Sequence, residues 1–533
     1  MITLDGHSLT LDALVAIAHG ESIELSSAAR QRIVTSRRVV DEFADHDDPT
    51  YGINTGFGNF AEVRIPHDSL SELQVNLLRS HAAGVGEPLP VPVVRATMAL
   101  RVNVLAKGFS GIRLDTIDLL IAMVNHGVVP VVPSRGSVGA SGDLAPLAHL
   151  ALVVIGEGYA TIEAGPLRGS RPTDSTLVGR DPRSGPVGTA GLVRPAISGA
   201  EALARVGLQP VALASKEGLA LINGTQPSTA LLGLSVAAAE RLARAADIAA
   251  ALSIDGLQGS TKPFDPRIHA ARPFTGQAIV AANLARLLSG SAINAAHANC
   301  GRVQDAYSMR CAPQVHGTAR DAFAYAHAVF DVEANAATDN PMVFADTREI
   351  VSGGNFHGAP VSVAADLLCL GLAQLATISE RRSDRLVNPA SSGLPAFLTR
   401  HGGLQSGLML AQVTAAALTS ELKSLAHPAS VDSIPTSGNR EDHVSMSMTA
   451  ALKAARAVEL ARHVVAIELL CAAQAIDLLQ PLESSAALMP VHRALRRHVA
   501  VLEHDRPPAP DIAAIVRMID SGELERASAN KVN

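Results

Sequence analysis

The sequence predicts a mainly α-helical protein, in which a bundle of long helices follows a mixed N-terminal portion. Hydrophobic residues make up 47% of the 533 residues, so a large core is available. Ala- and Leu-rich segments dominate the second half, and their small side chains let helix axes approach closely. Segments typical of strands are few. The ranges expected as long helices are 229–253, 278–297, 319–337, 359–383, 404–426 and 446–479.

Composition along the chain suggests four portions. Residues 1–160 form the mixed N-terminal portion, and 161–200 is rich in Gly, Pro, Arg and Ser, which favours a long exposed loop. Residues 201–480 hold the central bundle of long helices. Residues 481–533 are expected to form a C-terminal helical segment.

Charge and cysteine content exclude several classes of protein. Lys and Arg number 44 against 50 Asp and Glu, a net charge of −6, which gives no basis for binding nucleic acid or an anionic membrane. Four cysteines lack metal-ligand spacing, and the N-terminus lacks the form of an export signal. Residues 402–420 are uncharged but interrupted by Gly, Gln, Ser and Thr, so we expect a buried helix rather than a membrane span. A reduced, cytoplasmic protein is the simplest interpretation.

A helix is expected over 68–81. Ser69 and Glu72 have the spacing of a capping box, and apolar residues follow at helical intervals. His81 falls on the same face as Leu70 and therefore points inward. By position alone, a core histidine is the simpler interpretation.

An extended segment and a helix are expected on either side of a Gly-rich turn. Residues 127–134 (GVVPVVPS) are β-branched and punctuated by Pro, which suits an extended, buried conformation. A helix should start near Asp143, with Ser141 or Asp143 as its cap and Pro146 in its first turn. The turn therefore lies at the positive end of a helix dipole.

The turn has two chemical interpretations. Gly136, Gly139 and Gly142 could cradle a phosphate, but the Lys-Ser/Thr ending of a phosphate loop is missing. Alternatively, Ala140-Ser141-Gly142 can cyclise when the Gly142 nitrogen attacks the Ala140 carbonyl and water leaves, including the Ser141 hydroxyl. The product would be a methylidene-imidazolone, which is a strong carbon electrophile. Flanking glycines would ease the close backbone approach that ring closure needs.

Residues 136–152 (GSVGASGDLAPLAHLAL) resemble the prosthetic-group motif of the aromatic amino-acid ammonia-lyase family. Other segments resemble that family's motifs in the same order along the chain: 51–58 (YGINTGFG), 221–226 (LINGTQ), 303–310 (VQDAYSMR), 338–341 (TDNP) and 353–357 (GGNFH). The resemblance implies a helical fold of the fumarase/aspartase type and a carbon-nitrogen lyase. It also implies an imidazolone formed from residues 140–142 without an external cofactor.

The resemblance assigns roles in this reaction. Tyr51 is the expected base, and because a phenol has a pKa near ~10 we expect a positive charge beside it, from Arg310 or a helix N-terminus. Tyr307 is a second expected catalytic residue. Gln304, Tyr307 and Arg310 recur every three residues, so on a helical turn they would share one side, and Arg310 would bind the substrate carboxylate.

Binding residues are also implied. Asn223 would hydrogen-bond the imidazolone or the amine, although Asn-Gly alone indicates a turn. Phe356 would wall the pocket, with core packing as the alternative. Ser80-His81 resembles the family's substrate-selecting pair. Family members are homotetramers in which three chains build each site, so the Tyr51 loop and residues 304–310 could come from different subunits.

Glu421 matches the family glutamate associated with imidazole recognition. A carboxylate in the apolar helix 404–426 needs a polar partner, either the substrate or a local pair such as Lys423 or a neighbouring chain. Together with His81 it favours conversion of L-histidine to trans-urocanate. Leu422 departs from the pattern, since the histidine-specific members commonly have Asn there.

Three alternatives remain open at this point. The same chemistry could act on tyrosine or phenylalanine, or it could serve an aminomutase that returns ammonia to the β-carbon. A catalytically inactive helical scaffold is a further alternative, although it would need neither Ser141 nor Tyr51. Residues 438–443 (GNREDH) include metal-ligating types but lack a recognised spacing, so no metal site is expected.

Overall fold

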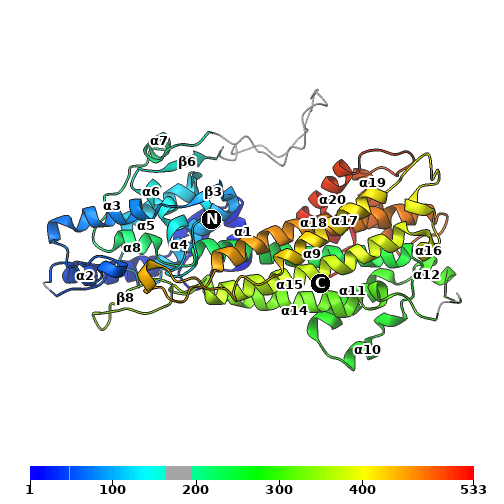
Figure 1. Cartoon of the computed structure of the whole chain (residues 1–533), viewed down its shortest axis with the longest axis horizontal. Coiled ribbons are helices and arrows are strands. Elements are labelled where there is room, and N and C mark those ends of the chain that lie inside the picture. Colours follow the sequence, from blue (N-terminus) through cyan, green and yellow to red (C-terminus); the bar gives the residue numbers. More distant parts are fainter. Residues whose placement is uncertain (47, 164–194, 299–300, 302) are drawn as a thin grey trace. The chain divides into compact units, whose positions relative to one another are not determined.

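The computed structural model describes residues 1–46, 48–163, 195–298, 301 and 303–533, and most of these residues are helical (Figure 1). They form two compact units. The first unit comprises Met1–Ala230, Asp331–Ala359 and Ser433–Met448. The second comprises Leu231–Phe330, Pro360–Asp432 and Thr449–Asn533. The predicted loop insert over 161–200 falls largely on 164–194, which lie outside the described residues.

The first unit combines helices with short strands. Its helices are α1 (Leu11–Ala18), α2 (Ser27–Ala44), α3 (Leu70–His81), α4 (Val91–Leu105), α5 (Leu114–Asn125), α6 (Leu144–Val154), α7 (Gly199–Arg205) and α8 (Glu217–Ile222). Short 3₁₀ turns lie at Gly58–Phe60, His67–Ser69 and Ser437–Asn439. Helix α4 is buried along nearly its whole length, so the other elements of this unit pack around it.

Nine short strands form four small sheets in the described residues. Strands β1 (Ile2–Leu4) and β2 (Ile23–Leu25) pair in parallel. The antiparallel pairs are β3 (Val85–Pro88) with β5 (Pro133–Arg135), and β8 (Met342–Phe344) with β9 (Glu349–Val351). The antiparallel three-stranded sheet contains β4 (Val128–Pro130), β6 (Tyr159–Ile162) and β7 (Ile197–Ser198). Strands β4 and β5 confirm the extended segment predicted over 127–134.

The predicted capping box at Ser69 is wrong. Helix α3 does begin at Leu70 with Ser69 at its N-cap position, but the Ser69 side chain makes no capping hydrogen bond. The preceding residues form a 3₁₀ turn in which Ser69 N donates to Pro66 O at 2.9 Å. This turn holds Ser69 at φ −101° and ψ −1°, whereas a capping serine adopts extended dihedral angles.

The second unit consists of helices. The longest are α9 (Gln226–Gly256), α14 (Ala312–Glu333), α15 (Ala359–Val387), α17 (Met409–Leu425) and α18 (Ser447–Leu478). The first residues of α9, α15 and α18 and the last residues of α14 belong to the first unit. Shorter helices are α10 (Pro266–Ala270), α11 (Thr275–Leu288), α12 (Ala292–Ala296), α13 (Tyr307–Arg310), α16 (Pro389–Ser392), α19 (Leu488–His498), α20 (Ala509–Ser521) and α21 (Glu523–Ala527). Two 3₁₀ turns lie at Lys262–Phe264 and Ala396–Leu398. The predicted bundle of long helices is thus present.

Three predicted helices differ in extent. The range 319–337 belongs to α14, which begins earlier, at Ala312, and ends at Glu333. The range 278–297 contains two helices, α11 and α12, because Gly290 adopts φ +80° and Ser291 then caps α12 by accepting from Asn294 N. The range 404–426 becomes helical only at Met409. Gly403 and Gly407 have φ of +98° and +57°. These angles are incompatible with an α-helix, so the helix cannot begin before Gly407.

Four long helices of the second unit meet at a buried ionic network. Arg382 of α15 pairs with Glu468 of α18, and both side chains are fully buried. Ser253 of α9 donates to Glu468 Oε1 at 2.7 Å. Arg382 Nη2 also lies 3.2 Å from Nε2 of His316 on α14, whose Nδ1 lies 2.8 Å from Oδ1 of Asp247 on α9. Each charge therefore has a partner, which a bundle core with few polar side chains requires.

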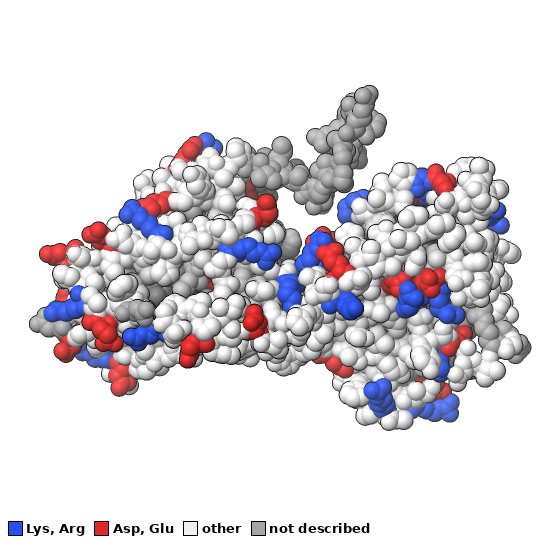
Figure 2. All heavy atoms as spheres, viewed as in Figure 1, with Lys and Arg blue, Asp and Glu red and all other residues white. Residues whose placement is uncertain are grey.

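Helix α17 is not the buried helix expected over 402–420. Only three of its side chains are buried in the chain, and Leu410 and Val413 are exposed. Among the described helices, α15 is long and apolar enough to cross a membrane, but most of its apolar part is buried within the protein. On the face of the protein drawn in Figure 2, acidic and basic side chains are interspersed.

A buried carboxylate makes the stability of the second unit depend on pH. Asp255, near the end of α9, accepts hydrogen bonds from Ser291 and Ser484, and burial raises its pKa to about 6. Because the pKa of an aspartate in the unfolded chain is about 3.9, protonation of Asp255 stabilises the folded state relative to the unfolded state. That stability is present below about pH 4 and is lost as the pH rises through 6, a change of about 3 kcal/mol.

We therefore expect Asp255→Asn to be more stable than the wild type at pH 7, and the difference to vanish near pH 4. Thermal or denaturant unfolding of both proteins across this pH range measures the difference. The exposed Asp432→Asn serves as the control and should show no such trend. A difference that is independent of pH would contradict the prediction.

Candidate active site

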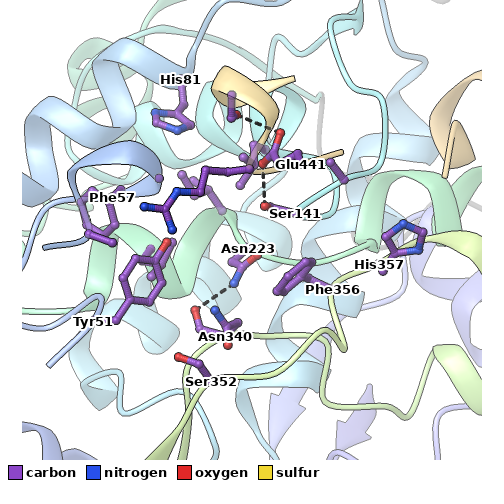
Figure 3. A pocket seen from close by; sticks show the side chains of 18 of the residues that line it. Tyr51, Phe57, His81, Ser141, Asn223, Asn340, Ser352, Phe356, His357 and Glu441 are labelled. Carbon is purple, nitrogen blue, oxygen red and sulfur yellow. Dashed lines mark hydrogen bonds between the residues drawn. The ribbon is translucent and has the colours of Figure 1, made fainter. Parts of the chain in front are cut away.

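A cavity of about 410 Å³ lies within the first unit (Figure 3). It is lined by the loop after α2, the end of α3, the turn before α6, the end of α8 and two segments from later in the chain. Six of the residues predicted from the sequence come together here: Tyr51, His81, Ala140, Ser141, Asn223 and Phe356. Gly142, the last residue of the predicted ring, follows directly after Ser141 and is buried.

The turn that carries the Ala-Ser-Gly tripeptide is held against the end of α8. Gly142 forms a β-bridge with Gly224, and Asp143 N donates to Gly224 O at 2.8 Å. Gly142 adopts φ +75°, and a Cβ atom there would lie 2.2 Å from Gly224 O. Only glycine fits this position, because both its dihedral angle and its surroundings exclude a side chain.

Asp143 fixes the two ends of this turn. It occupies the N-cap position of α6, as predicted, but its side chain does not cap that helix. Its carboxylate instead accepts from Ser137 Oγ at 2.7 Å and from Ser228 N at 2.9 Å. Burial raises the pKa of Asp143, and these two hydrogen bonds oppose that shift. The carboxylate therefore joins the residues before the tripeptide to the first turn of α9.

Asn223 presents an unpartnered oxygen at the cavity. It is buried at the end of α8, where Nδ2 donates to Asn340 O at 2.9 Å. Its Oδ1 has no hydrogen-bond partner among the described residues. Arg101 Nη1 donates to the Asn223 carbonyl oxygen at 2.7 Å, and Gly224 follows at φ +142°. Asn223 is extended and Gly224 forms a β-bridge, so the pair joins α8 to α9 without a turn, and the Asn223 side chain lines the cavity.

A buried ion pair orients the Asn223 amide. Lys216 Nζ lies 3.0 Å from Asp339 Oδ2, and both side chains are almost fully buried. The other oxygen, Asp339 Oδ1, accepts from Asn340 N at 2.7 Å and lies 3.4 Å from Asn223 Nδ2. Acceptors therefore surround the amide nitrogen, which leaves the amide oxygen to face the cavity.

Tyr51 lies on a loop that Asn54 folds back on itself. Thr50 N donates to Asn54 Oδ1 at 2.6 Å, and Asn54 Nδ2 donates to two carbonyl oxygens before it. The Tyr51 ring contacts Phe57 edge-on, with centroids 6.3 Å apart. Burial raises the pKa of Tyr51, a backbone hydrogen bond with Gly58 opposes the shift, and the Glu441 carboxylate adds to it.

This direction is opposite to the lowered pKa expected for a base beside a cation. Arg310 belongs to the second unit, where its guanidinium lies over the ring of Tyr307 at 4.6 Å. The cation that lines the same cavity as Tyr51 is Arg440, which the sequence analysis did not consider for this role.

His81 lines the cavity at the end of α3 and is not a core histidine (Figure 3). Its Nδ1 lies 2.9 Å from Leu77 O, so the neutral ring carries its proton on Nδ1 and keeps Nε2 as an acceptor. Burial lowers the pKa of His81, while the Leu77 hydrogen bond and the charge of Glu441 oppose this. Ser80 Oγ donates to the same carbonyl oxygen at 3.1 Å.

Gln304, Tyr307 and Arg310 do not share one helical face. Helix α13 covers only Tyr307–Arg310, so Gln304 precedes it in a non-helical segment and is exposed. The prediction of a common face is therefore wrong for Gln304. All three residues belong to the second unit, and Tyr307 is 70% exposed in the chain. The described residues that line the cavity all belong to the first unit.

Glu421 also belongs to the second unit and has a local partner. It lies on α17, about half exposed, and pairs with Arg456 at 3.1 Å. Glu421 therefore forms a local ion pair, as one of the two interpretations expected, but its partner is Arg456 and not Lys423. The expected cost of burying Glu421 does not arise, because α17 lies at the surface.

The segment 437–443 belongs to the site but was not predicted from the sequence. Ser437, Gly438 and Asn439 adopt φ of 50°, 63° and 67°, a left-handed run that is rare outside glycine and turns the chain sharply. Glu441 and His443 then line the cavity. The polar run between two predicted helices was the available signal. The described residues contain no cluster of three or more His, Cys, Asp or Glu that could hold a metal ion.

An Ala-Ser-Gly turn that faces a cavity together with Tyr, His and Asn is the arrangement that the motif resemblance implies for a helical carbon-nitrogen lyase. Residues 9–497 match the family model described as aromatic amino acid lyase. The chain belongs to this family. The family resemblance and the enzyme class inferred from the sequence motifs are thereby confirmed.

Curated and solved relatives agree with this assignment over the full length. A histidine ammonia-lyase from Anaeromyxobacter sp. (strain K) is 55% identical over 528 residues, which cover 98% of this chain and 99% of that protein. A crystal structure of histidine ammonia-lyase from Trypanosoma cruzi superposes with a TM-score of 0.88 at 43% identity, covering 100% of this chain and 96% of that one.

A tyrosine aminomutase from Streptomyces globisporus also superposes with a TM-score of 0.88. It is 35% identical, and the match covers 100% of this chain and 99% of that one. These neighbours confirm the predicted helical fold of the fumarase/aspartase type.

The contact between Gly142 and Gly224 yields a test. We expect Gly142→Ala to shift the turn away from α8, because its Cβ would meet a backbone oxygen at 2.2 Å and its φ of +75° disfavours alanine. The variant should lose stability by about 2 kcal/mol or more, which thermal unfolding measures. Gly402→Ala, where nothing lies within 4 Å of the added Cβ, is the matched control. An unchanged melting temperature for Gly142→Ala would refute this account of the turn.

Proposed function

We propose that the protein eliminates ammonia from L-histidine to give trans-urocanate. The observation that carries this proposal is that the Ala140-Ser141-Gly142 turn opens on the same cavity as Tyr51, His81 and Asn223. The relatives of highest identity described above, which carry the name histidine ammonia-lyase, support it further.

We also propose that Ala140, Ser141 and Gly142 form a methylidene-imidazolone and that no external cofactor is needed. The residues fit this group. Gly139, like Gly142, cannot be replaced by a larger residue. A Cβ atom at this position would lie 2.3 Å from the hydroxyl oxygens of Ser445 and Ser447. The backbone on both sides of the tripeptide is thus anchored while the tripeptide faces the cavity. The group would supply an electrophilic carbon for the substrate amine.

Asn223 would hold the nitrogen that leaves. Its buried Oδ1 has no partner, and a buried acceptor without a donor is costly. A substrate ammonium group or the adduct amine would supply the missing donor. Lys216 and Asp339 would keep the amide in this orientation.

Tyr51 would remove the β-proton through its phenol oxygen. Within the chain its raised pKa keeps it protonated at neutral pH, so an added positive charge must favour the phenolate before it can act as the base. We propose that Arg310, Tyr307 and Gln304 reach the site from other subunits of a homotetramer. Arg310 would then bind the substrate carboxylate with its planar guanidinium.

His81, Phe356 and Glu421 would select the imidazole side chain. The Nε2 atom of His81 can accept from an imidazole N–H, since Nδ1 is already committed to Leu77. Phe356 lines the cavity as an apolar wall. Glu421 would contribute from a neighbouring subunit. We place the enzyme in the cytoplasm, with a small amino acid as substrate and no nucleic-acid or membrane partner.

A second candidate is an aminomutase or lyase that acts on tyrosine or phenylalanine. The high structural similarity to a tyrosine aminomutase supports this candidate. Leu422 also supports it, because histidine-specific members commonly have Asn at this position. An inactive scaffold is the remaining alternative.

Substrate preference is tested by incubating the purified protein separately with L-histidine, L-tyrosine and L-phenylalanine. We expect kcat/KM for histidine to exceed the others by about a hundredfold or more, because only its ring matches two polar side chains. Ultraviolet absorbance of the product measures this. Faster turnover of tyrosine would refute the proposed substrate. An intact mass lacking any loss of water would support the inactive scaffold.

The role of Tyr51 is tested with Tyr51→Phe. We expect kcat to fall by about 10²- to 10⁴-fold, since the general base is removed, while the protein still loses two water molecules from residues 140–142. Tyr159→Phe, at an exposed tyrosine of the same unit, is the matched control and should keep full activity. Wild-type activity in Tyr51→Phe would show that Tyr51 is not the general base.

A further inference from the structure

Glu441 contacts the serine of the tripeptide directly. Ser141 Oγ donates to Glu441 Oε1 at 2.8 Å, and Figure 3 shows both side chains at the cavity. Formation of the proposed ring removes the Ser141 hydroxyl, so this hydrogen bond can exist only before that hydroxyl has left. Ser141 and Glu441 are 300 residues apart in sequence, which excludes a local effect of the turn.

Glu441 is held in place by the segment that precedes it. Its second oxygen, Oε2, accepts from Thr436 Oγ1 at 2.6 Å and from Ser437 Oγ at 2.9 Å. Thr436 and Glu441 also form a β-bridge, in which Thr436 N donates to Glu441 O at 3.0 Å. The left-handed run over 437–439 closes this short loop. Strained backbone of this kind is typical of functional sites, where it aims a side chain.

Formation of the proposed imidazolone removes two different water molecules. The first contains the Ala140 carbonyl oxygen and the hydrogens of the Gly142 and Ser141 nitrogens, and it leaves when the new N–C bond closes the ring. The second contains the Ser141 hydroxyl and the Ser141 Cα proton. After ring closure the Cα proton is acidic, because a carbonyl and a C=N bond flank it, but hydroxide remains a poor leaving group.

We propose that Glu441 is the proton donor for the departure of the Ser141 hydroxyl, an inference that rests on the function proposed above. The Cα proton passes to water, and the electron pair of that bond forms the new C=C bond. Glu441 is a carboxylate in the observed contact, so it first takes a proton from solvent and becomes the donor to Ser141 Oγ. The Cβ–O bond then breaks, and Glu441 gives this proton to the leaving oxygen, which departs as water and leaves Glu441 as a carboxylate again. The step is neutral overall and needs only water as a further reactant.

The chain offers Glu441→Gln as the test variant, because the amide keeps the shape of the side chain and one acceptor oxygen but cannot supply the proton. Glu441→Asp keeps the acid and serves as the conservative rescue. Glu349→Gln, an exposed glutamate of the same unit that does not line the cavity, is the matched control. Each full-length protein is purified after a short expression pulse. Mass spectrometry of the peptide that contains residues 140–142 then follows the loss of none, one or two waters over time.

We expect the wild type and Glu349→Gln to lose both waters. Glu441→Gln should accumulate the species that has lost one water, with the second loss slowed about a hundredfold or more, and Glu441→Asp should restore much of that rate. Loss of both waters from Glu441→Gln at the wild-type rate would overturn the proposal. Loss of neither water would also overturn it, because a residue needed only for the shape of the loop would block ring closure first. If the wild type itself lost no water, the proposed function would fail, and not this inference alone.

Discussion

The close approach of two backbone segments, Gly142–Asp143 and Gly224, is the constraint on which the site depends. It places the turn before α6 against the end of α8, so that Ser141 and Asn223 face one cavity. The approach requires glycine at 142, and the buried carboxylate of Asp143 locks it from the other side. Side chains from the rest of the first unit are then arranged around this junction.

Buried charges support that junction from behind. Arg101 donates to the Asn223 carbonyl oxygen, while Asp339, which is paired with Lys216, lies beside the Asn223 amide nitrogen. Burying such ions is costly, and removing one partner would leave the other uncompensated. These buried ions orient the Asn223 side chain, so that its oxygen faces the cavity before any ligand binds. The second unit uses a similar arrangement, Arg382 with Glu468, to join helices where no reaction is proposed.

The long helices could be predicted because their signal is local, as in the Ala- and Leu-rich run that became α9. The motifs also located the residues of the first unit that line the cavity. Errors arose where the decisive partner is distant or the helix is short. Ser69 does not cap because a 3₁₀ turn precedes it, and Gln304 lies outside a helix of four residues. Glu441 was missed because no local pattern links it to Ser141.

The 300 residues between Ser141 and Glu441 have a consequence for biosynthesis. A nascent polypeptide that has emerged only as far as α9 already contains the tripeptide and Gly224, yet it lacks the acid that contacts the serine. If Glu441 completes the heterocycle, maturation must wait until translation has passed the segment 436–441. The prosthetic group would then form only in chains synthesised at least to residue 441, and a product truncated before it would stay inert towards amines.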